Sequence, residues 1–329
     1  MTSRQFNLLL IVASVLAILG ACLLGTTPMG LGQAFAAFAG QSVTADSVVI
    51  WEIRLPRALA AFVVGAALGC SGAALQGLLR NPLAEPGVLG VTATASLSAT
   101  FALYYGLAAS SAFLLPVFAI VGALLATALL AVAAIRIKSV VTLILIGVGL
   151  SSFSASVMSL LLNLAPNPFS LSDMMNWLLG SVANRSFEDL RTTLPFIVVG
   201  LAVLLMSRRG LAALTLGDEA ASGIGLDLHK QRIAVVLGAG LATGAAVALA
   251  GAIGFVGIVA PHIVRPFVDH DPARSLLPSG LLAGLILVLA DIAVRLLPTT
   301  TELKLGVVAA LIGAPAFIWI AMQRRVTYD

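Results

Sequence analysis

Apolar stretches about as long as a lipid bilayer is thick recur ten times along this chain, with little else between them. A helix that crosses a membrane needs about 20 mostly apolar residues. The stretches span residues 6–26, 57–79, 88–107, 112–135, 140–163, 191–207, 231–250, 252–268, 277–297 and 306–323. Only 10% of the 329 residues are charged, against about 25% in an ordinary soluble domain. We therefore expect an all-α, polytopic membrane protein of about ten transmembrane helices, folded as a single domain over residues 1–329.

The distribution of lysine and arginine orients this predicted bundle. Cytoplasmic loops of membrane proteins carry an excess of both residues. With a cytoplasmic N-terminus, twelve of the 18 Lys and Arg residues fall on the inner side. The six on the outer side are Arg54, Arg57, Arg185, Arg191, Arg295 and Lys304. The sequence therefore predicts that both termini are cytoplasmic.

Several kinds of chemistry have no motif in this sequence. No Gly-Lys dipeptide occurs, so the chain lacks a phosphate-binding loop of the kind that binds ATP. Its three histidines are scattered, and neither an H-E-x-x-H nor a G-x-S-x-G pattern is present. No basic block with interleaved aromatic residues points to nucleic acid. We expect no catalytic residue, no metal, no cofactor and no nucleic-acid partner, in a chain surrounded by the lipid bilayer.

Small residues recur at the spacing of helix contacts. Glycines four positions apart lie on one helix face and let two backbones approach closely in a membrane. The pairs are Gly65 with Gly69, Gly240 with Gly244, and Gly280 with Gly284. They predict a tightly packed bundle and say nothing about function.

Asp291 is the only carboxylate well inside a predicted span, and intramembrane charges are costly and often functional. Arg295 follows four residues later on the same helix face. This spacing favours a self-neutralised pair and leaves an ion relay as the alternative.

The fifth predicted span carries a polar stripe. Its residues are spaced four, three and four positions apart, which places them on one helix face. They are Ser152, Ser156, Ser159 and Asn163. The stripe serves either as a hydrogen-bonding contact between helices or as the wall of a wet passage.

Arg54 and Arg57 lie three residues apart beside the outer end of the second span, and with Arg295 they form an outward-facing basic set. One interpretation is ordinary anchoring at the lipid headgroups. The other is docking of an acidic patch on a soluble partner, since the planar guanidinium group pairs well with carboxylates.

Local strings between about residues 50 and 320 carry a resemblance to a known family. They are Arg54-Leu55-Pro56-Arg57, Gly65-Ala66-Ala67-Leu68, Arg80-Asn81-Pro82-Leu83-Ala84-Glu85-Pro86, Trp177-Leu178-Leu179-Gly180-Ser181, Gly254-Phe255-Val256-Gly257, Pro261-His262-Ile263-Val264-Arg265 and Gly313-Ala314-Pro315. In this order they resemble the FecCD-type permeases, the membrane subunits of ABC importers for iron–siderophore complexes, haem and vitamin B12. The match is specific to the family and says little about the cargo.

This resemblance implies a type II ABC importer permease fold in the bacterial inner membrane. The family works as a homodimer whose translocation pathway follows the dimer axis. Two cytoplasmic ATP-binding subunits hydrolyse ATP, and a periplasmic substrate-binding protein delivers the cargo. The alternative function is a secondary transporter or channel without an ATPase, which would need coupling-ion ligands in the membrane beyond Asp291.

The resemblance also implies roles for individual residues. Docking of the binding protein falls to Arg54, Arg57 and Arg295. Contact with the ATPase falls to the segment at about 208–230, centred on Leu216, Gly217, Asp218, Glu219 and Ala220. Asn81 and Leu83 help to close the cytoplasmic end of the pathway. Val140 and Val141 stand at gate positions where the family often has small hydroxyl residues, so a polar gate is in doubt there.

Overall fold

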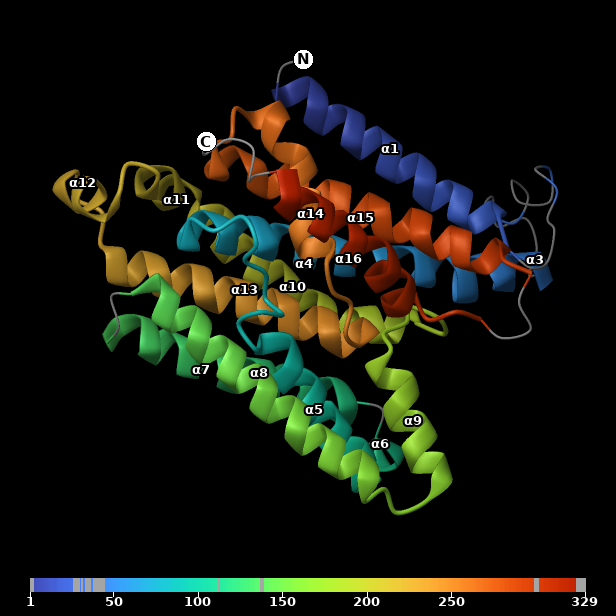
Figure 1. The fold of residues 1–329 in the computed structure, drawn as a ribbon. Helices are drawn as coiled ribbons and strands as arrows, with labels where there is room; N and C mark the ends of the chain where they lie inside the picture. Colours follow the sequence, from blue (N-terminus) through green and yellow to red (C-terminus); the bar gives the residue numbers. More distant parts are fainter. Residues whose placement is uncertain are drawn as a thin grey trace.

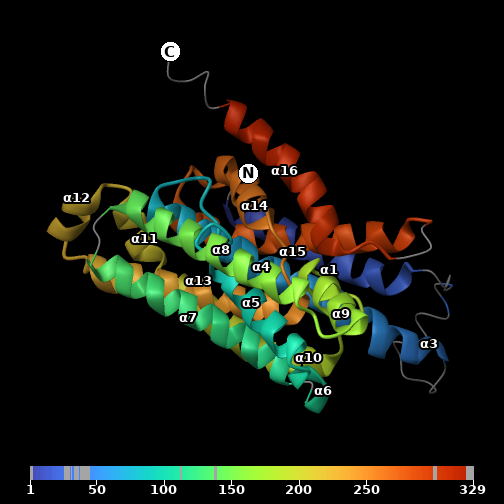
Figure 2. The same cartoon turned by 60° about the horizontal axis from the view of Figure 1, so that its bottom comes forward.

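The computed structural model describes residues 3–25, 30, 32, 37, 45–111, 113–136, 139–298 and 302–323. All regular structure within these ranges is helical, as the sequence predicted. The long helices run roughly alongside one another in an elongated bundle (Figures 1 and 2). The elements are α1 (Ser3–Leu23), α3 (Ala45–Val48), the π-helical turn η1 (Val49–Arg54), α4 (Leu55–Leu79), α5 (Val91–Tyr104), α6 (Leu107–Ser110), α7 (Leu114–Arg136), α8 (Val140–Asn163), α9 (Pro168–Leu178), α10 (Phe187–Met206), α11 (Arg208–Leu214), α12 (Asp218–Gly223), α13 (Leu228–Ala250), α14 (Val256–Val264), the 3-10 turn η2 (Arg265–Val268), α15 (Pro272–Leu296) and α16 (Leu305–Gln323).

Each of the ten predicted spans overlaps one of these helices, in the expected order. Within the described residues, seven helices are long and apolar enough to cross a membrane. The helical stretches at 91–104, 256–268 and 305–318 are apolar but shorter. The positions of the ten segments are therefore confirmed, and within the part of the chain that the structure describes seven of them have the length and apolarity of a full span.

Glycine helps to explain why two of the predicted spans are shorter in the structure. The predicted span at 88–107 shrinks to α5 because Gly90 and Gly106 adopt left-handed φ values of 81° and 68° at its two ends. The predicted span at 252–268 begins only at Val256, because the chain leaves α13 at Gly251 with φ 72°. A left-handed backbone ends a helix, and glycine adopts it at no steric cost.

Two stretches between the predicted spans, at 27–55 and 164–190, contain helical structure. The connection at 27–55 includes residues 45–54, which run directly into α4 and give a continuous helical stretch from Ala45 to Leu79. The connection at 164–190 contains α9, which begins at Pro168. Its N-cap residue Asn167 accepts a hydrogen bond from the Ser170 amide at 2.9 Å, and proline suits the first helical turn.

The three glycine pairs lie at helix contacts, which confirms that prediction. A Cβ atom added at Gly65 of α4 would lie 2.4 Å from the Ala283 carbonyl oxygen of α15. One added at Gly284 of α15 would lie 2.6 Å from the Phe62 ring of α4. Both distances are shorter than any van der Waals contact, so only glycine permits α4 and α15 to approach this closely. Gly240 of α13 meets α7 in the same way.

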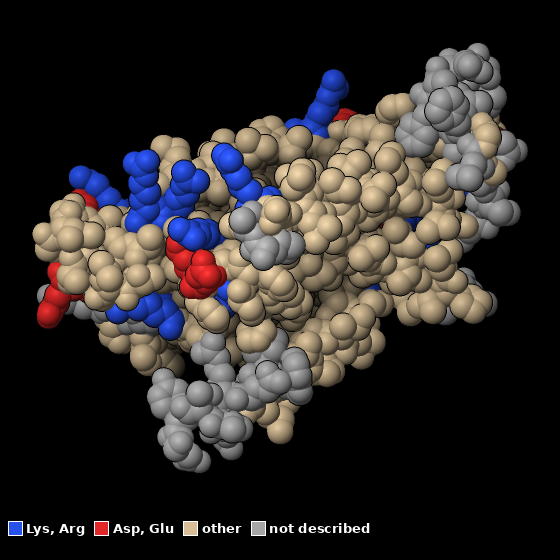
Figure 3. Space-filling model, turned by 90° about the horizontal axis from the view of Figure 1, so that it is seen from above, with Lys and Arg blue, Asp and Glu red and all other residues tan. Residues whose placement is uncertain are grey.

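The two ends of the bundle differ in charge. In the view of Figure 3, most visible Lys and Arg side chains lie toward the end formed by α11 and α12. This is the end that carries the residues assigned to the cytoplasmic side by their charge. The segment at about 208–230 lies there and contains α11, which ends at Leu214, and α12.

Candidate functional site

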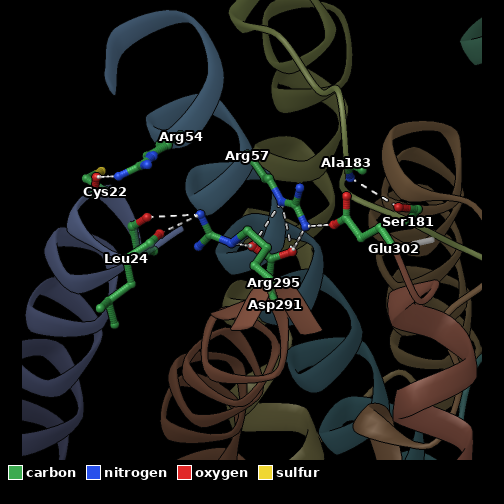
Figure 4. Close-up of polar contacts among 10 residues, drawn as sticks. Cys22, Leu24, Arg54, Arg57, Ser181, Ala183, Asp291, Arg295 and Glu302 are labelled. Atoms are coloured by element: carbon green, nitrogen blue, oxygen red, sulfur yellow. Dashed lines mark hydrogen bonds and ion pairs between the residues drawn. The ribbon is translucent and has the colours of Figure 1, made fainter. Parts of the chain in front are cut away.

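At the other end of the bundle, α4 and α15 are joined by a charged network (Figure 4). Arg57 donates to Asp291 through Nε at 3.0 and 3.1 Å and through Nη2 at 2.7 Å. The Nε atom of Arg295 lies 3.2 Å from the other side of the same carboxylate. Glu302, just before α16, forms a further ion pair with Arg57. Asp291 and Arg295 thus form the predicted pair, and sequence reasoning missed Arg57 as its third member.

Arginines also cap the end of α1. Arg54 donates through Nη1 to the carbonyl oxygens of Cys22 at 3.0 Å and Leu23 at 2.9 Å. Arg295 donates to those of Ala21 at 3.0 Å and Leu24 at 3.2 Å. The last carbonyl groups of a helix have no partner within the helix and carry partial negative charge. The two guanidinium groups therefore stabilise the C-terminus of α1 and hold it against α4 and α15.

The three arginines predicted to dock a partner are thus already engaged. Arg54 is 4% exposed and Arg57 is 9% exposed, and both guanidinium groups bind atoms of this chain. Docking through Arg54, Arg57 and Arg295 stays a prediction, and it requires these contacts to open.

The predicted coupling segment forms the tip of the opposite end. Leu216 is 65% exposed there, although it is apolar. Gly217 follows with φ 99°, and Asp218 begins α12. Asp218 forms ion pairs with Arg80, the residue that ends α4, and with Arg232 of α13 at 2.7 Å. Glu219 and Ala220 are exposed on the same short helix. The tip is therefore tied by charge to two long helices.

A structured loop at residues 80–90 connects α4 to α5. Arg80 turns the chain with φ 47° at the end of α4. The Asn81 side chain then accepts a hydrogen bond from the Leu83 amide at 3.0 Å, which fixes the turn. Asn81 and Leu83 are both partly buried. The predicted gate loop thus has a defined conformation next to the Asp218 ion pairs.

Glu85 of the same loop was not singled out by sequence reasoning. Its carboxyl group accepts a hydrogen bond from the Phe255 amide, directly before α14, and burial raises its pKa to about 7. Beside it lies a small cavity of about 30 Å³, bordered also by Leu68 of α4 and Gly257 of α14. No spacing in the sequence signals this contact, because the two groups are far apart along the chain.

The polar stripe lies on an exposed face of α8. Ser152, Ser156, Ser159 and Asn163 are all exposed in the isolated chain. The Ser156 and Ser159 hydroxyls donate at 2.9 Å to carbonyl oxygens of α8 itself. The contact between helices is made instead by the buried Ser154, whose hydroxyl lies 3.3 Å from that of Thr94 in α5. The stripe is therefore available to something outside this chain.

The remaining predicted gate residues lie at the start of α8. The helix begins at Val140 after the N-cap residue Ser139, whose hydroxyl accepts the Thr142 amide at 3.3 Å. Val141 is 66% exposed. Within the residues that the structure describes, no group of three or more His, Cys, Asp or Glu side chains is placed to hold a metal ion.

Comparisons with known proteins identify the family of this chain. The model of the FecCD transport family matches residues 9–323. The vitamin B12 import system permease protein BtuC of Vibrio cholerae is 41% identical over 283 residues, covering 85% of this chain and 84% of that protein. The ABC transporter permease protein YvrB of Bacillus subtilis is 38% identical over 299 residues, covering 89% and 84%.

The fold has a match among solved structures. An inward-facing structure of a metal-chelate type ABC transporter superposes with a TM-score of 0.85 at 28% sequence identity, covering 98% of this chain and 99% of that one. The family match covers nearly the whole sequence, and in the aligned regions the relatives are identical to this chain at about two fifths of the positions. This chain therefore belongs to the FecCD transport family of ABC importer permeases.

Proposed function

We propose that two copies of this chain form the translocation pathway of an ATP-driven importer in the bacterial inner membrane, with both termini in the cytoplasm. Two ATP-binding subunits and a periplasmic substrate-binding protein complete the assembly. The observation that carries the proposal is the family match over residues 9–323, on a fold shared with a metal-chelate type ABC transporter. Since the sequence has no phosphate-binding loop, ATP is hydrolysed on a separate subunit.

The exposed stripe on α8 supports the homodimer. A hydroxyl or amide group facing lipid is costly unless it has a partner. The Ser156 and Ser159 hydroxyls already donate within α8, but together with Ser152 and Asn163 they form an exposed polar face in the single chain. A second copy or a water-filled pathway between copies would accommodate this face. We place the pathway along this face, with Val140 and Val141 at the inner end of α8 and the Asn81–Leu83 turn close to the cytoplasm.

The tip formed by α11 and α12 is our proposed contact with the ATPase. Leu216 offers an exposed apolar side chain for a groove on that subunit. Asp218 connects any displacement of the tip to α4 and α13 through Arg80 and Arg232. ATP binding on the partner would draw two such tips together and switch the pathway from one side of the membrane to the other.

The charged network that joins α4 and α15 specifies how docking of the binding protein would occur. Arg57, Asp291, Arg295 and Glu302 together carry no net charge. An acidic partner would therefore compete with Glu302, whose side chain is 41% exposed, for Arg57. We propose that docking through Arg54, Arg57 and Arg295 proceeds by this exchange, since the two inner contacts to Asp291 are buried.

The cargo we propose is a metal chelate: an iron–siderophore complex, haem or cobalamin. Vitamin B12, for which the BtuC relatives are named, and the metal chelate for which the solved transporter is named both belong to this chemical class. Uptake of labelled ferric siderophore, haem and cobalamin in parallel, each in competition with the other two, would identify the cargo.

The decisive experiment is reconstitution of the chain in vesicles with its ATPase subunits. The proposal predicts copurification of a nucleotide-hydrolysing subunit and cargo uptake that requires ATP. Uptake driven by an ion gradient without that subunit would favour a secondary transporter instead. The pairing of Asp291 with two arginines speaks against that alternative, because this carboxylate is already neutralised within the chain.

A further inference from the structure

A separate cavity of about 310 Å³ opens beside the C-terminal half of α9. It lies between that helix, the connection from α9 to α10, and the residues that precede α16. Among the side chains that line it are Asp173 and Asn176 of α9, Arg185 of the connection, and Lys304. None of these belongs to the network of Arg57 and Asp291.

The wall of this cavity is held firmly. The Ser181 amide donates to the Ala250 carbonyl oxygen at 2.7 Å, and the Gly306 amide donates to that of Gly180 at 3.0 Å. Gly180 has φ 68°, and a Cβ atom added there would lie 2.3 Å from the Ala252 carbonyl oxygen. These contacts tie the loop carrying Arg185 to the end of α13 and to the start of α16.

The Arg185 guanidinium group has an unsatisfied donor: its Nε atom is buried and has no hydrogen-bond acceptor among the residues that the structure describes. Burial lowers the pKa of Arg185, and the nearby Asp189 carboxylate opposes the effect only in part. That carboxylate is occupied elsewhere, because it accepts hydrogen bonds from the Ser186 amide at 2.8 Å and the Ser186 hydroxyl at 2.9 Å. An additional anion would therefore offset the desolvation of the guanidinium group.

Lys304 adds a second unpaired cation. Among the residues described, no carboxylate lies within 4.0 Å of either the Lys304 ammonium or the Arg185 guanidinium group. Asp173 borders the cavity but is exposed and beyond that distance. The buried Nε1 of Trp177, on the same wall, also has no acceptor within the described ranges. The site thus offers N–H donors and a net charge of one positive unit, which suits a carboxylate.

We propose that this cavity binds an acidic side chain of the soluble binding protein, so that Arg185 and Lys304 form a docking contact distinct from the buried Arg54, Arg57 and Arg295. The inference rests on the proposed function. A protein-borne carboxylate fits because these cations lie on the side that the charge distribution assigns to the exterior, recessed in a rigid wall. A side chain that projects from a partner can reach such a recess.

The test uses the reconstituted transporter and the binding protein of the same transport system, with and without cargo. We would measure the dissociation constant of the binding protein for wild type, Arg185→Gln, Lys304→Gln and the double variant, at low and high salt. We expect at least a tenfold weakening in the double variant and a smaller dependence on salt. Arg191→Gln is the matched control, since Arg191 is an exposed cation of α10 that does not line the cavity.

Each outcome decides the proposal. Unchanged affinity in a double variant with wild-type thermal stability would overturn it, as would an equal loss in Arg191→Gln. If the cargo-free binding protein docked normally and only the KM of uptake rose, the carboxylate would belong to the cargo and the proposed docking contact would be wrong. If wild type bound no soluble protein and required no ATPase, the proposed importer function itself would fail.

Discussion

Asp291 and Arg57 lie 234 residues apart in the sequence and meet in a buried ion pair, where two nitrogens of Arg57 donate to the Asp291 carboxylate. Because Asp291 is 1% exposed, removal of its charge would leave the buried Arg295 without its carboxylate partner and Arg57 paired only with the part-exposed Glu302. Breaking a buried ion pair by deleting one partner costs about 3 to 5 kcal/mol. We expect Asp291→Asn to lower the thermal unfolding temperature in detergent sharply.

The same network supplies a control for that experiment. Glu302 is 41% exposed, so its pairing with Arg57 is screened by solvent and contributes about 1 kcal/mol or less. Glu302→Gln should therefore have a much smaller effect than Asp291→Asn. Equal unfolding temperatures for the two variants would mean that the network does not hold α4 to α15.

Glycine contacts give a second stability prediction. A Cβ atom added at Gly72 of α4 would lie 1.9 Å from the Gly257 carbonyl oxygen of α14, with no flexible side chain to move aside. We expect Gly72→Ala to destabilise the protein by about 1 to 3 kcal/mol. Gly20→Ala in α1 is the control, because nothing lies within 4 Å of the added atom. Helix propensity alone makes that change favourable by up to about 1 kcal/mol. A neutral Gly72→Ala would contradict the close packing of α4 on α14.

Features that depend on residues close together in the sequence could be predicted, whereas contacts between distant segments could not. Helix positions were predictable because they depend on local apolarity and length. The Asp291–Arg295 pair was predictable because it spans one helical turn. The contact with Arg57 was not, since it depends on how α4 and α15 pack. The burial of Arg54 could not be predicted from the sequence either, because it depends on contacts with the carbonyl groups at the end of α1.

Glu85 leads to a prediction about pH. Its pKa in the folded protein is about 7, above the ordinary value of 4.5, because burial disfavours the charged form. The folded protein therefore favours the protonated form of Glu85, and binding this proton stabilises the fold. The stabilisation is fully present below pH 4.5 and is lost as the pH rises through 7. We expect wild type to lose about 1 to 3 kcal/mol of stability between pH 5 and pH 8 from this group.

The Glu85→Gln variant isolates that contribution. Its amide oxygen can still accept the Phe255 N–H group, and it does not titrate, so the variant should be more stable than wild type at pH 8 and similar at pH 5. Glu85→Leu removes the acceptor and should be destabilised at both values. Parallel stability curves for wild type and Glu85→Gln between pH 5 and pH 8 would contradict the raised pKa.

Asp218 provides a prediction for transport. Neutralising it removes both ion pairs of α12, to Arg80 and to Arg232. We expect Asp218→Asn to reduce ATP-driven uptake at least tenfold while the ATPase subunits still copurify, because the tip would remain but would no longer transmit its motion. Asp269→Asn is the control, since this exposed carboxylate pairs only loosely with Arg274 at 3.5 Å. Full uptake by Asp218→Asn would remove these ion pairs from the coupling mechanism.

The serine stripe of α8 can be mapped by cysteine chemistry, because the two native cysteines, Cys22 and Cys70, are buried. If the stripe borders a wet pathway, a water-soluble thiol reagent should modify Ser152→Cys, Ser156→Cys and Ser159→Cys in the assembled transporter. Ser154→Cys on the same helix is the control, since Ser154 is 1% exposed and faces Thr94 of α5. The stripe variants should react at least ten times faster, because the reagent needs a hydrated thiolate. Equally slow reaction at all four positions, with and without ATP, would place the stripe against lipid or in a dry contact between copies, and the pathway would have to follow another face.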